Sequence, residues 1–156
     1  MRNITIRAFN EKDLEAIFEI IKQWAIYEKA LDQLTNSIKQ MRDEKDSFNC
    51  LVAENEDKKI VWIAMYCFVY YSWVGKSMYL EDITVDQNFR RQGIGTMLLN
   101  EIFKVAESNK CNRLRWQVLD WNEPAIKMYE KIGANITSEW NNCDFDQKWI
   151  LEFNNK

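Results

Sequence analysis

The apolar positions near the N-terminus alternate first and then recur at helical spacing. Residues 3–8, NITIRA, alternate like a short β-strand. Asn10 and Asp13 can cap the helix that is predicted next. Its apolar positions follow the i, i+3, i+4, i+7 rule, and they are Leu14, Ile17, Phe18, Ile21, Trp24 and Ala25. A second short helix is predicted over residues 36–44, so this region predicts one strand followed by two helices.

The middle of the chain predicts three antiparallel strands. Aromatic and β-branched residues fill three runs that are separated by the polar turn 55–59 and by Gly75. The runs are residues 48–54, 60–71 and 77–85. Because the connections between them are short, we expect a hairpin followed by a third strand of the same meander.

The last third of the chain alternates between helix and strand patterns. A helix predicted from about Gly95 to Ser108 keeps four apolar residues on one face, namely Ile94, Leu98, Ile102 and Val105. The elements predicted after it are a strand, a helix that Gly133 ends, and two strands, over residues 113–118, 122–132, 135–138 and 146–153. A meander followed by this alternation predicts an α+β fold around a mixed sheet, with parallel pairing in its second half.

Length, composition and charge fit one globular domain. The chain of 156 residues is expected to form a single domain over residues 1–156, with 47% apolar residues to fill a core. Its net charge of -3 argues against a nucleic-acid-binding surface and favours a cationic ligand. The polar N-terminus resembles no signal peptide, and no apolar run approaches the roughly 20 residues of a membrane span. We therefore expect a cytoplasmic protein without a nucleic-acid or membrane partner.

The cysteine and histidine content restricts the chemistry. The four cysteines are scattered and the chain has no histidine, so we expect no metal site. A general base must then be a carboxylate, a lysine, a tyrosine or a water molecule held by one of these groups.

The segment NFRRQGIGTMLLNEIF, residues 88–103, has the composition of an anion-binding turn. Gly93 and Gly95 let the backbone approach a ligand, and the N-terminus of the following helix attracts negative charge. Arg90 and Arg91 add full positive charges, so a pyrophosphate is the expected ligand. The motifs GxxxxGK[ST] and GxGxxG do not describe this turn. The alternative is a plain glycine turn beside two solvated arginines.

Two further places combine polar groups with apolar surroundings. Glu81 and Asp82 are neighbours in an otherwise apolar strand, where they point to opposite faces unless a bulge intervenes. Burying them requires hydrogen bonds or a charged partner, whereas an edge strand would leave them solvated. Tyr129 shares a helix face with Ile126, so its spacing favours core packing. Asn122 has the spacing of a helix N-cap.

These motifs together resemble one enzyme family. Arg90, Gly93 and Gly95 fit the pattern [RQ]-x-x-G-x-[GA] of the GNAT superfamily of N-acetyltransferases, in which this turn cradles the pyrophosphate of acetyl-CoA. The segments YLEDITV and DWNEPAIKMYEKIGA are similar to those of its spermidine/spermine N-acetyltransferase branch, and the order of elements agrees along nearly the whole chain. The resemblance implies a mixed, mostly antiparallel sheet with helices on both faces, acetyl-CoA as co-substrate, and a homodimer.

The resemblance also implies roles for individual residues. It suggests Glu81 as the base, acting through water, and Tyr129 as the acid that protonates the coenzyme A thiolate. Substrate contacts are implied for Tyr27, Glu28, Trp73, Glu81 and Asp82, although Glu28 fits a solvated helix end equally well. Cofactor contacts are implied for Ile83, Thr84, Val85, Arg90, Arg91, Gln92, Gly93, Ile94, Gly95, Thr96, Asn122 and Ala125.

Three departures from the family pattern bear on the substrate. Trp62 stands where the family usually has glycine, Tyr71 stands where polyamine-acetylating relatives carry an acid, and the tail matches only loosely. The expected acceptor is therefore a small polyamine, a diamine or a lysine-like amine, attacked directly in a ternary complex because no cysteine lies near the motifs in sequence. The alternatives are a protein or peptide amine as acceptor, or a non-catalytic acyl-CoA-binding module.

Overall fold

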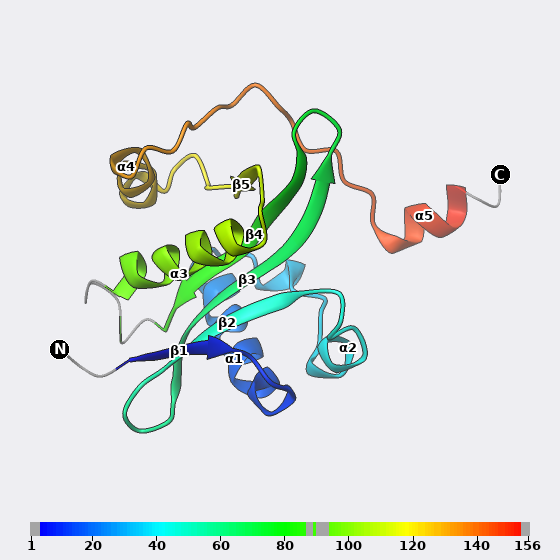
Figure 1. Ribbon diagram of the computed structural model, residues 1–156. Coiled ribbons are helices and arrows are strands. Elements are labelled where there is room, and N and C mark those ends of the chain that lie inside the picture. Colours follow the sequence, from blue (N-terminus) through cyan, green and yellow to red (C-terminus); the bar gives the residue numbers. More distant parts are fainter. Residues whose placement is uncertain (1–3, 87–88, 90–93, 154–156) are drawn as a thin grey trace. The chain divides into compact units, whose positions relative to one another are not determined.

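A computed structural model describes residues 4–86, 89 and 94–153, which belong to two compact units, Met1–Gln117 and Val118–Lys156. The first unit is built on a five-stranded sheet in the order β1-β2-β3-β4-β5 (Figure 1). Neighbouring strands are antiparallel except for β4 and β5, which run parallel. The strands are β1 (Thr5–Ala8), β2 (Asn49–Glu54), β3 (Ile60–Tyr71), β4 (Gly75–Val85) and β5 (Arg113–Arg115). The predicted α+β fold with a mixed sheet is confirmed.

Helices cover both faces of this sheet, as expected (Figure 1). On one face, α1 and α2 bury their apolar stripes against β2 and β3 around a cluster that includes Leu14, Ile17, Met41, Val52 and Ile63. On the other face lies α3, whose Leu98 and Ile102 are fully buried. The bounds are η1 (Glu11–Asp13), α1 (Leu14–Tyr27), η2 (Leu31–Gln33), α2 (Ile38–Asp43) and α3 (Ile94–Ser108).

Small neighbours surround the bulky Trp62 near the start of β3. The indole is 1% exposed, and its cross-strand partner on β2 is Ala53. Ala64 lies two residues further along β3 and therefore on the same face. These two alanines leave volume beside the indole, and the β2–β3 register shifts directly next to this pair, between Ala53 and Glu54.

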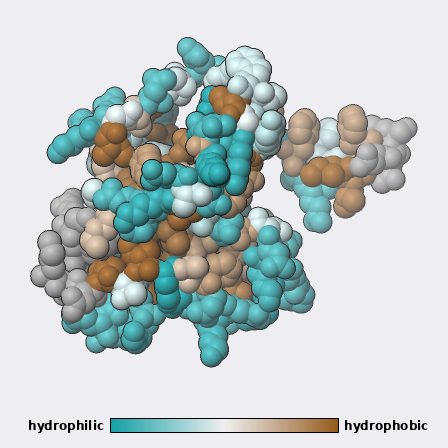
Figure 2. All heavy atoms as spheres, in the orientation of Figure 1, coloured by the Kyte–Doolittle hydropathy of each residue, from teal (hydrophilic) through white to brown (hydrophobic). Residues whose placement is uncertain are grey.

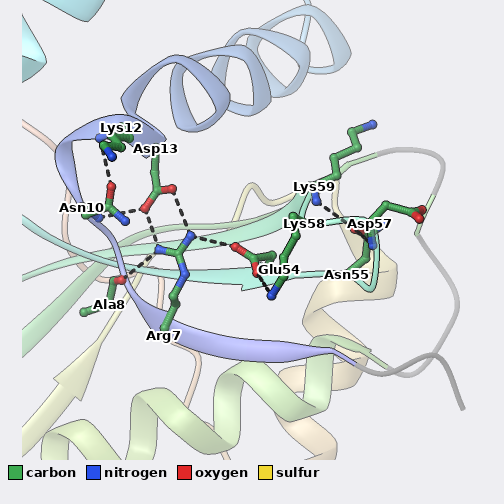
Figure 3. A network of polar contacts seen from close by, with 10 residues as sticks. All are labelled: Arg7, Ala8, Asn10, Lys12, Asp13, Glu54, Asn55, Asp57, Lys58 and Lys59. Atoms are coloured by element: carbon green, nitrogen blue, oxygen red, sulfur yellow. Dashed lines mark hydrogen bonds and ion pairs between the residues drawn. The ribbon is translucent and has the colours of Figure 1, made fainter.

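Arg7 joins three elements of the first unit through its guanidinium group (Figure 3). It donates to both carboxylate oxygens of Asp13, at 2.7 and 3.0 Å, and to Glu54 Oε2 at 2.9 Å. Asp13 also accepts the backbone N–H of Asn10 at 2.8 Å and so completes a capping box at the start of η1, where Asn10 and Asp13 were the expected caps. The hydrogen bond from Arg7 is the main reason that the pKa of Asp13 lies below its usual range.

We expect Arg7→Met to lower the free energy of unfolding by about 1 to 2 kcal/mol at neutral pH, because it leaves Asp13 without its charged donor. The pKa values of Asp13 and Glu54 are lowered in the folded state, so their contribution is present above the unfolded values and lost as pH falls through the folded ones. Urea unfolding at neutral pH and at about pH 3 should therefore show a difference that shrinks with acidification. Lys39→Met, which removes an exposed pair with Asp43, serves as control. A difference independent of pH would contradict this role of Arg7.

The second unit contains one predicted helix and one that was not predicted. Helix α4 (Glu123–Lys131) begins at its N-cap Asn122, and Gly133 adopts a φ of 92° just beyond its end, as expected. In the first unit, the strand predicted over residues 113–118 is shorter than expected and ends at Arg115. The strand predictions for the tail are wrong: residues 135–138 form none, and α5 (Gln147–Phe153) is a helix.

Local capping explains the helix α5. The side chain of Asp146 accepts the backbone N–H of Trp149 at 2.8 Å, and the Asp146 carbonyl accepts from Ile150. Lys148 and Glu152 are spaced as an i, i+4 pair. The apolar residues of α5 are exposed and are visible on its surface (Figure 2). The apolar run that suggested a strand therefore belongs to a short helix with exposed apolar side chains.

Candidate functional site

A β-bulge in β4 decides where the two adjacent carboxylates point. The β3–β4 register pairs Met65 with Asp82 and Tyr66 with Leu80, so Glu81 is an extra residue without a partner in the β3–β4 register. Without a bulge, Glu81 and Asp82 would face opposite sides of the sheet. The bulge lets both side chains project from the same side. The sequence alone could not decide whether the two carboxylates share a face of the sheet, and the bulge indicates that they do.

Glu81 and Asp82 lie on the face of the sheet that α1 covers. Met65, the partner of Asp82, packs against the α1 cluster, and by strand alternation Cys67 and its partner Tyr79 lie on the same face. The negative charge of Glu81 raises the pKa values of both Cys67 and Tyr79, after the larger effect of burial. Glu81 therefore belongs to this face as well.

Cys67 lies closer to the acidic residues than the sequence motifs indicated. The expectation that no cysteine lies near the site holds in sequence but not in space, because Cys67 is within electrostatic reach of Glu81. Burial and this neighbouring charge both raise the pKa of the Cys67 thiol. A thiol with a raised pKa holds little thiolate at neutral pH and is a poor nucleophile.

Three carboxylates converge at this point of the sheet. Burial, then the charges of Glu81 and Glu28, raise the pKa of Asp82 to about 6. Glu28 caps the C-terminus of α1, and burial raises its pKa against the opposing effect of a hydrogen bond from Trp24. Among the described residues, no lysine or arginine forms an ion pair with any of the three. This arrangement favours an added cation.

We expect Asp82→Asn to raise the free energy of unfolding by about 1 to 3 kcal/mol near neutral pH. The folded-state pKa of Asp82 is raised, so the ionised carboxylate costs stability, and this cost grows as pH rises from the unfolded value through about 6. At about pH 4 the folded-state carboxyl is largely protonated, and the advantage of the variant should be small. Urea unfolding at the two pH values measures this. An equal advantage at both would exclude charge as its cause.

The predicted aromatic substrate residues lie in different places. Tyr27 is half-exposed and stacks on Trp24, with ring centroids 5.2 Å apart, one residue before Glu28. Trp73 lies in the turn between β3 and β4 and is 88% exposed. Gly75, at the end of this turn, precedes Glu81 by six residues along β4, which is about 20 Å. Tyr27 thus stacks on Trp24, whose side chain donates a hydrogen bond to Glu28, whereas Trp73 lies apart from the carboxylates.

The cofactor residues of β4 lie where the sheet opens between β4 and β5. The ladder to β5 covers Ser77–Tyr79, whereas the ladder to β3 continues to Val85. Ile83 and Val85 are therefore in the part of β4 beyond its pairing with β5, and Thr84 is buried on the α1 face. An extended ligand that carries amide groups can pair with the backbone of such a strand.

The glycine turn is only partly covered by the structure. Arg90, Arg91, Gln92 and Gly93 lie outside the described residues. Helix α3 begins at Ile94 and includes Gly95 and Thr96, so a helix N-terminus directly follows the turn, as the sequence predicted. Such an N-terminus favours the binding of an anion.

The remaining predicted residues lie in the second unit. The Asn122 side chain accepts the backbone N–H of Ala125 at 3.4 Å, which confirms its role as N-cap of α4. Tyr129 is 6% exposed, and burial raises the pKa of its phenol. The hydroxyl is therefore protonated near neutral pH and can act as a proton donor.

Sequence reasoning missed Arg113 and Arg115 of β5. Their guanidinium carbons each lie 5.3 Å from the centroid of the Tyr71 ring, a cation–π distance. Beside them, the Tyr79 hydroxyl donates to Gln117 Oε1 at 2.9 Å. The sequence feature that could have revealed them is the alternation of arginines in RLR, which places both side chains on one face of a strand.

A hollow of about 440 Å³ lies elsewhere, between β1 and α3. Its lining includes Ile6, Met97 and Phe103 and none of the predicted site residues.

Within the described ranges, no group of three or more histidine, cysteine, aspartate or glutamate side chains is placed to hold a metal ion. No helix in the described part of the chain is long and apolar enough to cross a membrane.

The chain is similar to known proteins in both sequence and fold. Residues 8–134 match the Acetyltransferase (GNAT) family. The chain is 34% identical to a thialysine N-epsilon-acetyltransferase of Sus scrofa over 100% of both chains. It is also 34% identical to the spermidine/spermine N(1)-acetyltransferase-like protein 1 of Homo sapiens, over 94% of this chain and 23% of that protein. The fold is similar to that of an integron cassette protein from the mobile metagenome of V. cholerae, with a TM-score of 0.77 and 20% identity over 98% of each chain. The chain therefore belongs to the acetyltransferase (GNAT) family.

Proposed function

We propose that this protein transfers an acetyl group from acetyl-CoA to the primary amine of a small polyamine, diamine or lysine-like substrate, by direct attack in a ternary complex. The observation that carries the proposal is the convergence of Glu28, Glu81 and Asp82 on one face, beside the point where β4 leaves β5. Amines of this kind are cations at neutral pH, and carboxylates without a cationic partner attract them. The similarity to thialysine and spermidine/spermine acetyltransferases supports the same substrate class.

The roles of the carboxylates follow from their environments. Asp82, with a pKa of about 6, is mostly ionised at neutral pH and holds the ammonium group together with Glu28. Glu81 is exposed, so a water molecule can carry the proton that it removes from the amine. The freed amine nitrogen then forms the new bond to the acetyl carbon as the bond from that carbon to sulfur breaks, and the nitrogen releases its second proton to water to give the neutral amide.

The leaving thiolate needs a proton, which we assign to Tyr129. Its buried phenol has a raised pKa and stays protonated until a strong base such as a thiolate develops. Acetyl-CoA supplies the acetyl group as a thioester. The raised pKa of Cys67 supports direct attack over an acetyl-cysteine intermediate.

For acetyl-CoA itself, we assign the backbone of Ile83, Thr84 and Val85 to its pantetheine arm, and residues 90–96 to its pyrophosphate. Asn122 and Ala125 complete the proposed cofactor contacts. The ladder geometry of β4 and the N-terminus of α3 support this assignment. We further propose one N-acetyltransferase domain over residues 1–156, since the family match spans the boundary between the two units. From the family resemblance we also propose a homodimer, and from the sequence a cytoplasmic location.

Charge reversal of Arg90 and Arg91 to glutamate should weaken acetyl-CoA binding by about 10-fold or more, because two favourable contacts to the pyrophosphate become repulsive. Isothermal titration calorimetry measures this directly. The same titration with coenzyme A lacking the acetyl group should show an equal loss. Unchanged affinity would remove the pyrophosphate from this turn.

A panel of amines tests the acceptor class. Coenzyme A release should be fastest with small amines such as spermidine, thialysine or lysine, and slow with a lysine-containing peptide. The peptide proving the best acceptor would favour a protein acetyltransferase. Binding of acetyl-CoA without release for any amine would favour a non-catalytic acyl-CoA-binding module.

A further inference from the structure

The face that carries the three carboxylates also carries two arginines. The β4–β5 register pairs Arg113 with Ser77 and Arg115 with Tyr79, so both arginines stand beside the segment that leads to Glu81. Both guanidinium groups lie on the ring of Tyr71. Among the described residues, neither arginine forms an ion pair. Two like charges held together without a carboxylate favour the binding of an anion.

The distance between the two charged ends is that of a short ligand. Along β4, Tyr79 lies two residues from Glu81 and Ser77 lies four residues from it, which is about 7 and 13 Å at the usual rise of a strand. Tyr79 lies between the ends, because it pairs with Arg115 on β5 and precedes Glu81 by two residues on β4. The face therefore has a negative end and a positive end, and the smaller of these two backbone separations is comparable to the length of an extended lysine.

We propose that Arg113 and Arg115 bind a carboxylate at the far end of the acceptor, so that the preferred substrate is an amino acid whose side chain ends in a primary amine. This inference rests on the proposed function and names its substrate class. A guanidinium group binds a carboxylate through paired hydrogen bonds. The second ammonium group of a diamine would instead meet two positive charges, with Tyr71 supplying no negative charge. The arginines thus determine specificity at a distance from the reacting amine.

Matched pairs of amines isolate this contact. Lysine and cadaverine differ only by the carboxylate, as do ornithine and putrescine. For the wild-type protein, kcat/KM should favour the amino acid of each pair by about 10-fold or more. The double variant Arg113→Gln/Arg115→Gln should lower this ratio by about 10-fold or more, through a higher KM for the amino acid, without slowing the diamine. Arginine-to-lysine changes at both positions should restore part of the preference, because they retain the charge.

Lys76→Gln is the control, because it removes one positive charge from β4 on the opposite face, where Lys76 contacts the Phe68 ring. It should leave the ratio unchanged. A wild-type preference for the diamine would overturn the inference, and so would a ratio that the double variant does not alter. A higher KM for acetyl-CoA with an unchanged ratio would assign the arginines to the cofactor instead.

The wild-type comparison requires no variant to fold. Coenzyme A release with neither member of any pair would refute the proposed function itself. In that case, calorimetric binding of lysine and cadaverine to the wild-type protein still tests the arginines. Tighter binding of lysine is the expected result, and equal or weaker binding would overturn the inference.

Discussion

Tyr129→Phe should lower kcat by about 10-fold or more and leave the affinity for acetyl-CoA nearly unchanged. The substitution removes only the hydroxyl and keeps the buried ring, so the packing of α4 is retained. Without the phenol, the thiolate must leave unprotonated or take its proton from water, and either route raises the barrier. Initial rates of coenzyme A release, together with calorimetric binding of acetyl-CoA, measure the two quantities separately.

Tyr70→Phe provides the matched control. Tyr70 is 81% exposed near the end of β3, and removal of its hydroxyl should leave kcat unchanged. A Tyr129→Phe enzyme with the wild-type rate would remove Tyr129 from the mechanism and leave core packing as its role. A loss of rate that appears together with a large loss of stability would also contradict the assignment, because the ring is meant to remain in place.

Glu81→Gln should lower kcat by about 100-fold, because it removes the group that accepts the amine proton while preserving size and polarity. Glu81 sits in a bulge and is exposed, so the change should cost little stability. It should also lower the pKa of Asp82 from about 6, because a neighbouring negative charge is lost. NMR titration of the Asp82 carboxyl reports this shift independently of activity.

The same chemical change at Glu101 controls for lost charge in general. Glu101 lies on α3, where it pairs with Lys104 at 2.6 Å, and Glu101→Gln should leave kcat unchanged. A Glu81→Gln enzyme within about 3-fold of the wild-type rate would transfer the role of base to another group. Glu81→Asp should keep part of the activity, because it keeps a carboxylate in the bulge.

The elements that the sequence predicted well are those with an unambiguous period. The runs of β2, β3 and β4 combine β-branched and aromatic residues with turn residues at both ends, so strands were the only good solution. The tail segment 146–153 lacks such a signal, because a short apolar run fits either period. The hydrogen bond from Trp149 to the side chain of Asp146 starts a helix there instead.

The candidate site was predictable in its residues but not in its arrangement. Neighbouring carboxylates in an apolar strand already marked Glu81 and Asp82 as unusual. Whether they share a face depends on the register with β3, which is fixed by pairing between distant segments. The approach of Glu28 to Asp82 and the contact of Arg115 with Tyr71 are likewise tertiary. No local pattern encodes these contacts, so the RLR alternation could predict two arginines on one strand face but not the face of the sheet on which they lie.

Initial rates of coenzyme A release over a grid of acetyl-CoA and lysine concentrations test the central claim most directly. Direct attack in a ternary complex predicts release that requires the amine, double-reciprocal lines that intersect, and N-acetylated lysine as product. Parallel lines with a burst of coenzyme A in the absence of amine would show an acetyl-enzyme intermediate and contradict the account. Failure to release coenzyme A with lysine or any other small amine would contradict it as well.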